Sequence, residues 1–264
     1  MLLKSVLLFG GKGGVGKSTL SCATALRLSE RGRTILLSLD PAHSLRSILG
    51  TSEGSIGKLS VVELNAENLA REYTDSVLKN MEGVINAKAY QELKKLAHHI
   101  SSSPTAIETA VLDRLSQIIK EDYHYVVLDF APTGQMLRLF KTFHVVREWV
   151  DVLIKLSKDR ERVDRFMGRE MGTAKVLTER RERIELLIRT LEERGMFLAV
   201  ANEDKLSLEE AERLKKELNF IRCYMVINKW EKTMGDFLKV AYSQNPYGVK
   251  ALEELNIDDI LSVV

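Results

Sequence analysis

A glycine-rich loop near the start of the chain constrains the fold more than any other feature of the sequence. The apolar run at residues 6–9 predicts a buried strand, and small and apolar residues spaced along 17–30 predict a helix that packs on a sheet. Between them lies the pattern G-x-x-x-x-G-K-[ST], made of Gly11, Lys12, Gly13, Gly14, Val15, Gly16, Lys17 and Ser18. A strand, this loop and a helix in that order predict a site for nucleotide phosphates.

The residue types of this loop suit the phosphates of a nucleoside triphosphate. Glycines allow successive backbone N–H groups to turn toward phosphate oxygens, and the N-terminus of the helix adds a favourable potential. We expect Lys17 to reach the β- and γ-phosphates and Ser18 to offer its hydroxyl to Mg²⁺, with Thr19 completing the nucleotide-binding set. The expected cofactors are therefore ATP and Mg²⁺.

Further apolar runs of strand length follow the loop, and helical periodicity precedes or follows each of them. They lie at residues 34–39, 61–64, 125–129, 196–201 and 224–227. Strand–helix–strand units have parallel strands and right-handed crossovers. The sequence therefore predicts an α/β fold with a doubly wound, mostly parallel sheet of P-loop NTPase topology. We expect one domain over residues 1–264, with helical additions at about 67–119 and 143–193.

Two local signals predict where helices of this fold begin and end. Gly32 follows the first helical pattern and is a candidate for its C-terminal cap. The run 207–210 has the form S-x-x-E of a capping box, which predicts that Ser207 caps the N-terminus of a later helix.

Charge and cysteine usage limit the classes of partner. The 39 basic and 37 acidic side chains nearly balance, so the net charge of +2 gives no support for a nucleic-acid partner. Cys22 and Cys223 are far apart and form no CxxC pair, so we expect neither a disulfide framework nor a zinc site. No apolar run reaches the roughly 18 residues of a membrane span, and we expect a cytoplasmic protein.

Three charged residues suggest how the bound nucleotide is hydrolysed. Lys12 is a second lysine, early in the loop and poorly placed to reach the phosphates of its own nucleotide. Asp40 follows the strand at 34–39, at the carboxyl edge of the sheet, where a carboxylate can orient or deprotonate the attacking water. Asp129 ends the apolar strand at 125–129, as in a Walker B motif, and would hold Mg²⁺ through a water. Lys17 and Asp40 are therefore predicted catalytic residues, and the resemblance described next implies a catalytic role for Lys12 as well.

These motifs resemble a family of dimeric ATPases. The early lysine gives the deviant loop found in MinD and ParA proteins, nitrogenase iron protein and the arsenite-pump ATPase. The run D-P-A-H-S-L at 40–45 resembles the first switch of the arsenite-pump and tail-anchored-protein targeting ATPases. Residues 129–139 resemble their second switch, D-T-A-P-T-G-H-T-L-R-L, with departures at Phe130, Gln135 and Met136. The resemblance implies switch residues at Asp40, Pro41, Ala42, His43, Asp129, Pro132, Thr133 and Gly134.

The same resemblance implies partners for two of these residues. In the family, the early lysine crosses a dimer interface to the γ-phosphate of the other subunit, which implies a homodimer and this role for Lys12. The run 226–229 is similar to the strand end where the family's asparagine bonds adenine, and this implies that role for Asn228. The family's eukaryotic CxxC zinc motif has no counterpart in this chain.

The resemblance implies an ATP-hydrolysing dimeric switch similar to the tail-anchored membrane protein targeting ATPase, with a hydrophobic protein or membrane-protein client. The apolar residues in 143–171 would line a client groove, although such stripes more often pack into a core. One alternative is an ATPase that drives arsenite or anion transport, which would need several thiolates to bind the metalloid. A more distant alternative is a MinD- or ParA-like or metallocentre-maturation ATPase.

Overall fold

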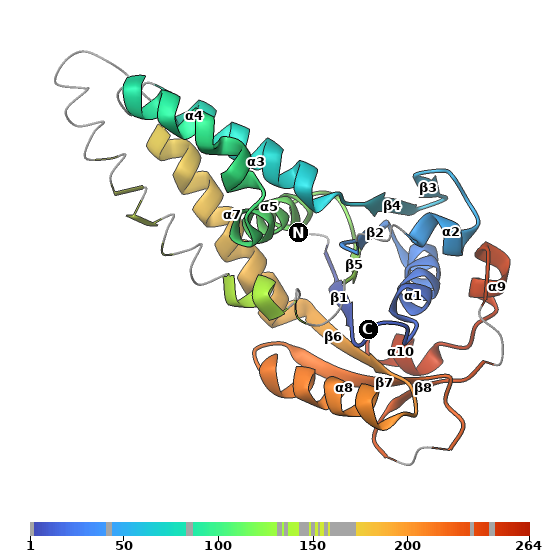
Figure 1. The fold of residues 1–264 in the computed structure, drawn as a ribbon. Helices are drawn as coiled ribbons and strands as arrows, with labels where there is room; N and C mark the ends of the chain where they lie inside the picture. Colours follow the sequence, from blue (N-terminus) through green and yellow to red (C-terminus); the bar gives the residue numbers. More distant parts are fainter. Residues whose placement is uncertain are drawn as a thin grey trace. The chain divides into compact units, whose positions relative to one another are not determined.

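The computed structural model divides into two compact units (Figure 1). Unit 1 comprises residues 1–64, 119–137 and 189–264, and unit 2 comprises residues 65–118 and 138–188. The structure describes residues 3–40, 44–82, 87–130, 134, 137–142, 148, 151–152, 154–155, 158, 173–232, 235–242 and 246–264.

Among the described residues, unit 1 is built on one eight-stranded sheet with the order β3-β4-β2-β5-β1-β6-β7-β8. Its paired strands run parallel, apart from the antiparallel pair β3–β4. This confirms the predicted α/β fold with a mostly parallel sheet. The strands are β1 Ser5–Gly10, β2 Thr34–Ser38, β3 Ser55–Ile56, β4 Leu59–Glu63, β5 Tyr125–Asp129, β6 Gly195–Ala201, β7 Arg222–Asn228 and β8 Leu238–Val240.

The central strands are buried on both faces, because helices cover the sheet on each side. The β1–β2 and β6–β7 connections run in opposite directions along the sheet, so right-handed crossovers place α1 and α8 on opposite faces, as Figure 1 shows. Side chains of α1, α9 and α10 share one apolar core with alternate residues of the strands. The helices of unit 1 are α1 Lys17–Arg31, α2 Leu45–Leu49, α8 Lys205–Glu217, α9 Val249–Glu253 and α10 Asp258–Ser262.

One of the two helix-end predictions is confirmed and the other is wrong. The Gly32 N–H donates to the Leu28 carbonyl at 3.1 Å and closes α1. Helix α8, however, starts before Ser207, and its N-cap is Asp204, whose carboxylate accepts from the Ser207 N–H at 2.9 Å. A carboxylate at the helix N-terminus also gains from the helix dipole, and the Ser207 hydroxyl donates back to the second carboxylate oxygen of Asp204 at 2.6 Å.

Unit 2 is helical in its described residues. Helix α3 packs against α4 and α5, and the Asn65 side chain caps its start by accepting from the Asn68 N–H. Helix α7 begins in unit 2 and its last residues belong to unit 1. The helices are α3 Ala66–Met81, α4 Ala87–Ser101, α5 Pro104–Ile118 and α7 Thr173–Arg194, with a further helical turn at 137–142.

The apolar stretch 143–171, for which we predicted a client groove or a core, lies mostly outside the described residues. Across the parts of the chain that the structure describes, we find no helix with the length and apolar character needed to cross a bilayer.

Candidate nucleotide site

The loop after β1 has a backbone that glycine alone can follow at two points. Gly11 has φ +144°, and a Cβ atom there would lie 2.2 Å from the Val200 carbonyl oxygen of the neighbouring strand β6. Gly16 has φ +92°, and a Cβ atom there would lie 2.2 Å from Asn228 Nδ2. Side chains at these positions would clash with fixed atoms, so the spacing of the glycines reflects the close packing under the loop.

Asn228, at the end of β7, holds the loop from below. Its side chain is fully buried, and Nδ2 donates to the Val15 carbonyl at 2.7 Å and to the Tyr242 hydroxyl at 3.0 Å. The amide oxygen Oδ1 is also buried and has no hydrogen-bond partner among the described residues. A buried acceptor of this kind fits a ligand that brings an N–H group, as adenine does.

Lys17 is the first residue of α1, and its side chain is enclosed by the loop with 6% exposed. Its ammonium donates to the Lys12 carbonyl at 3.2 Å, which closes the loop around it. Burial lowers the pKa of Lys17, and the carboxylates of Asp129 and Asp40 offset part of this effect. A buried cation beside exposed backbone N–H groups is suited to a phosphate.

Asp129 ends β5 between Phe9 of β1 and Ser38 of β2, and is fully buried. Its two carboxyl oxygens have no hydrogen-bond partner in the described part of the chain. Burial raises the pKa of Asp129 to about 6, although the nearby Ser18 hydroxyl and Lys17 ammonium counteract this. A buried carboxylate that makes no well-formed hydrogen bond and lies beside the Ser18 hydroxyl fits a hard cation with oxygen ligands such as Mg²⁺.

The first switch begins at Asp40, directly after β2. The Asp40 N–H donates to Ser38 Oγ at 3.1 Å, and its carboxylate is near enough to raise the pKa values of Lys17 and Asp129. Asp40 and the loop therefore lie together at the carboxyl edge of the sheet, where the sequence placed them.

Several predicted switch residues cannot be compared with the structure. Pro41, Ala42, His43, Pro132 and Thr133 lie outside the described residues, as does Gln135. Gly134 is described and has open space where a Cβ atom would point. These assignments stay predictions.

Lys12 differs from Lys17 in its surroundings. Its side chain is exposed at the top of the loop, as are Gly13 and Gly14, while Thr19 in the first turn of α1 is partly buried. The carbonyl of Lys12 accepts from Lys17, and its ammonium contributes to the lowered pKa of Asp204, after the larger effect of the Ser207 hydrogen bonds. The loop thus presents one enclosed lysine and one that reaches solvent.

A family model described as anion-transporting ATPase matches residues 4–230, which includes the loop, both strand-end aspartates and Asn228. The chain belongs to the anion-transporting ATPase family. It is an ATPase, as the sequence predicted.

Named relatives of this ATPase differ in length. The putative arsenical pump-driving ATPase 2 of Aquifex aeolicus is 32% identical, over 96% of this chain and 90% of that protein. The arsenical pump-driving ATPase of Escherichia coli is 28% identical, but the match covers 86% of this chain and 39% of that protein. An ATPase ASNA1 homolog of Cryptosporidium parvum is 29% identical, over 83% of this chain and 63% of that protein. The chain thus spans about four-tenths of the longer arsenical relative.

Both cysteines of this ATPase have thiols whose pKa is raised by burial. Cys22 is buried in α1, and burial raises the pKa of its thiol well above the ordinary value. Burial raises the pKa of the Cys223 thiol, in β7, to about 11, with Lys215 offsetting part of the shift. Thiols of this kind stay protonated near neutral pH, whereas the thiolate is the form that binds soft metals.

Sequence reasoning missed two residues of this ATPase that shape the site. Glu63 ends β4, and its carboxylate accepts from the N–H groups of Leu45 at 2.9 Å and Arg46 at 3.4 Å, which fixes the start of α2. An acid at a strand end was the available signal, since it identified Asp129. Tyr242 bonds Asn228 from a segment without a recognisable motif, so no sequence signal pointed to it.

Proposed function

We propose that this ATPase is a nucleotide-dependent homodimeric switch that binds Mg·ATP at the loop of unit 1 and works in the cytoplasm, where ATP is available. The carrying observation is the contrast between the two loop lysines. Lys17 is enclosed, and its ammonium bonds the loop itself, whereas the Lys12 side chain is exposed. An exposed lysine at the top of a phosphate loop is available to a nucleotide held by a second copy.

The surrounding groups support a division of roles within this site. Lys17 would neutralise the β- and γ-phosphates, and Ser18 with Asp129 would hold Mg²⁺, which shields phosphate charge. Asp40 would orient the attacking water. Lys12 of each copy would stabilise the charge that develops on the γ-phosphate of the other copy. Asn228 would accept a hydrogen bond from the adenine amino group at its unpartnered Oδ1.

Light scattering and phosphate release test the switch. We expect Asp40→Asn to bind ATP about as tightly as the wild type, to lose at least about 100-fold of its turnover, and to form a dimer with Mg·ATP. Adding Lys12→Ala should abolish that dimer. The exposed Lys205 of α8 supplies the control substitution Lys205→Ala, which should leave the dimer intact. A protein that stays monomeric with Mg·ATP, or a dimer that ignores Lys12, contradicts the proposal.

We further propose that residues 1–264 act as one ATPase domain whose helical additions in unit 2 receive a hydrophobic protein client. Support comes from α4, where Leu96 and Ile100 are one helical turn apart and 51% and 41% exposed. Co-elution with a synthetic transmembrane peptide tests this. Binding only with nucleotide, and its loss in Leu96→Ser with Ile100→Ser, is the expected result. A nucleotide-dependent dimer that does not bind the peptide contradicts the client role but not the proposed homodimeric switch.

A second candidate is an ATPase that drives anion transport, and it is favoured by relatives named arsenical pump-driving ATPases. The protonated state of the Cys22 and Cys223 thiols argues against a metalloid site made of thiolates on this chain. Turnover with and without arsenite decides between the two. Stimulation that survives replacement of both cysteines by serine would favour transport through another site, and no stimulation favours the switch.

A further inference from the structure

In the buried amide of Asn228, both N–H groups have hydrogen-bond partners and the oxygen has none in the described residues. The Val15 carbonyl can only accept, so the amide atom 2.7 Å from it is the nitrogen, and this fixes the orientation of the side chain. The second hydrogen of Nδ2 goes to the Tyr242 hydroxyl oxygen at 3.0 Å. Oδ1 is then the one hydrogen-bonding atom of this amide without a partner in the described residues.

Tyr242 adds a donor beside the same amide, through its contact with Nδ2. Its oxygen accepts from Asn228, so its own hydroxyl proton is directed elsewhere. Burial raises the pKa of the Tyr242 hydroxyl, with the Asn228 hydrogen bond offsetting part of the shift, so the proton is present at neutral pH. A Cβ atom on Gly16 would lie 3.3 Å from the Tyr242 oxygen, which places the hydroxyl directly under the phosphate loop.

An acceptor beside a donor is complementary to one edge of adenine. The amino group of adenine donates, and each ring nitrogen next to it, N1 or N7, accepts. Guanine has a carbonyl oxygen where adenine has the amino group, and that oxygen would face Oδ1, so that two acceptors would meet without a proton between them. A site built to donate and accept at fixed atoms rejects a ligand that leaves those atoms without partners.

We propose that Tyr242 is a specificity-determining residue of the ATP site, which donates to a ring nitrogen of adenine while Asn228 Oδ1 accepts from the adenine amino group. The inference rests on the proposed placement of ATP in this loop. Oδ1 is enclosed in the structure and Tyr242 is the partly exposed side chain beside it. For a base to reach the enclosed Oδ1, the Tyr242 side chain would have to move while the bond to Val15 holds Asn228 in place.

The test is Tyr242→Phe in the full chain, which removes the hydroxyl and keeps the ring. One neutral hydrogen bond corresponds to a factor of about five to ten in affinity. We therefore expect the KM for ATP and the Kd for ADP to rise about fivefold to tenfold, with kcat within about twofold. The Kd for GDP should stay unchanged, so the preference for adenine falls by the same factor. Tyr90→Phe is the matched control, because Tyr90 lies on α4 in unit 2, and it should behave as the wild type.

Adenine analogues separate base recognition from a structural role of Tyr242. Of 7-deaza-ADP and 1-deaza-ADP, the analogue that lacks the bonded ring nitrogen should bind wild type and Tyr242→Phe equally. Equal losses for ADP, GDP and both analogues would show that Tyr242 only supports the loop and would overturn the inference, as would unchanged affinity for ADP. A wild-type protein that binds no adenine nucleotide would instead refute the proposed ATP site itself.

Discussion

The nucleotide loop of unit 1 and the helix junctions of unit 2 both bury charged or polar groups, but they satisfy them differently. Asp129 and the Oδ1 atom of Asn228 have no hydrogen-bond partners in the described residues. In unit 2, Asp113 contacts Arg180 at 3.2 Å and Arg183 at 3.3 Å, and it also accepts from Gln117 at 2.9 Å. Buried groups left without partners indicate a ligand site, whereas paired ones hold helices together.

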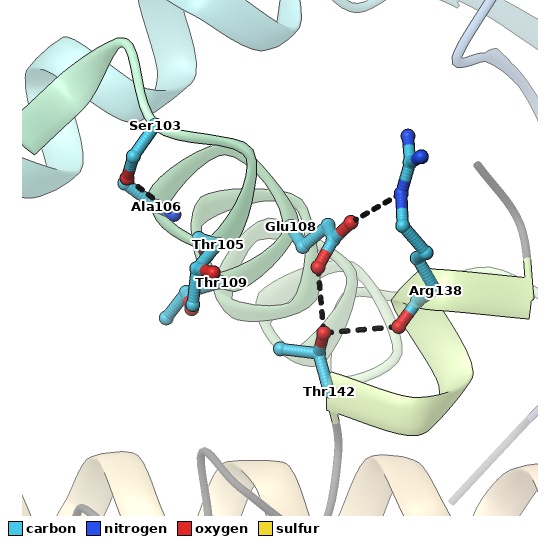
Figure 2. A network of polar contacts seen from close by, with 7 residues as sticks. All are labelled: Ser103, Thr105, Ala106, Glu108, Thr109, Arg138 and Thr142. Carbon is cyan, nitrogen blue, oxygen red and sulfur yellow. Dashed lines mark hydrogen bonds and ion pairs between the residues drawn. The ribbon is translucent and has the colours of Figure 1, made fainter.

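Figure 2 shows a second satisfied group in unit 2. One oxygen of Glu108, on α5, accepts from Arg138 at 3.1 Å, and the other accepts from the Thr142 hydroxyl at 2.6 Å. Thr142 Oγ1 also lies 2.9 Å from the Arg138 carbonyl oxygen. Every carboxylate oxygen in this cluster has a donor, so the contrast with Asp129 holds at two separate places.

The largest expected effect comes from breaking the paired side of the comparison. Asp113→Asn leaves the buried Arg180 and the half-buried Arg183 without their counter-charge, which should lower the free energy of unfolding by about 3–5 kcal/mol in urea. Turnover per folded molecule should change less than about twofold. Asp122→Asn is the control, because the Arg33–Asp122 pair is 54% exposed on both sides and should be worth less than about 1 kcal/mol. Similar losses in the two variants would contradict the argument.

The second-largest effect is expected on the rate of ATP hydrolysis. Lys17→Ala removes the enclosed cation of the loop and should reduce phosphate release by at least about 100-fold, since charge stabilisation at a transition state is typically worth that much. Its unfolding curve is a separate readout, because the substitution also removes a cation that stabilises the buried Asp129 carboxylate. Lys205→Ala should keep full turnover. If the Lys17→Ala protein hydrolyses ATP at the normal rate, the loop is not part of the catalytic site.

A pH titration of stability tests the unpaired group of the comparison, the Asp129 carboxylate in the nucleotide site. The pKa of Asp129 is about 6 in the folded chain against 3.8 when unfolded, so between these values the folded state binds more protons. Through this group, nucleotide-free protein should therefore lose stability as pH rises from about 4 to 6, by up to about 3 kcal/mol, and keep that loss above pH 6. Asp129→Asn should show a flatter profile in urea unfolding over the same range. If the stability of the wild type and of Asp129→Asn changes with pH in the same way, burial does not raise the pKa of Asp129.

The smallest effect is expected at the cluster of Figure 2. Glu108→Gln keeps an acceptor for Thr142 and removes the charge that faces Arg138, whose side chain is 63% exposed. The loss in unfolding free energy should be about 0.5–1 kcal/mol. Thermal unfolding of Glu108→Gln beside Glu108→Ala measures it, with the larger loss expected for Ala because Thr142 also loses its partner. A loss for Gln as large as that for Asp113→Asn would mean that the exposure of Arg138 does not weaken its ion pair.

The parts of the fold that follow from local pattern could be predicted from the sequence. Six strands, the first helix and its end at Gly32 were identified because apolar runs and glycine positions depend on neighbours in the chain. Strands β3 and β8 have two and three residues, too short for a period to show. The cap of α8 was misplaced because Asp204 and Ser207 both suit a helix start, and packing decides between them.

The residues of the candidate site also divide into those that a local pattern predicts and those that it does not. Its glycines, Lys17 and Asp129 stand in a motif or at a strand end, so their places could be predicted. The contact between Asn228 and Val15 joins residues 213 apart in the chain, and Tyr242 reaches the same point from yet another segment. Such contacts follow from the order of strands in the sheet, which no local pattern determines.

The edges of the sheet restrict how two copies can meet. Edge strands normally offer rows of free backbone groups to which a neighbouring chain can add a strand. In this sheet the outer strands are β3 and β8, with two and three residues, so a second copy would gain few backbone hydrogen bonds by extending it. Assembly through side chains and loops is then favoured. The homodimer proposed above would then be held by side chains and loops and not by added strands.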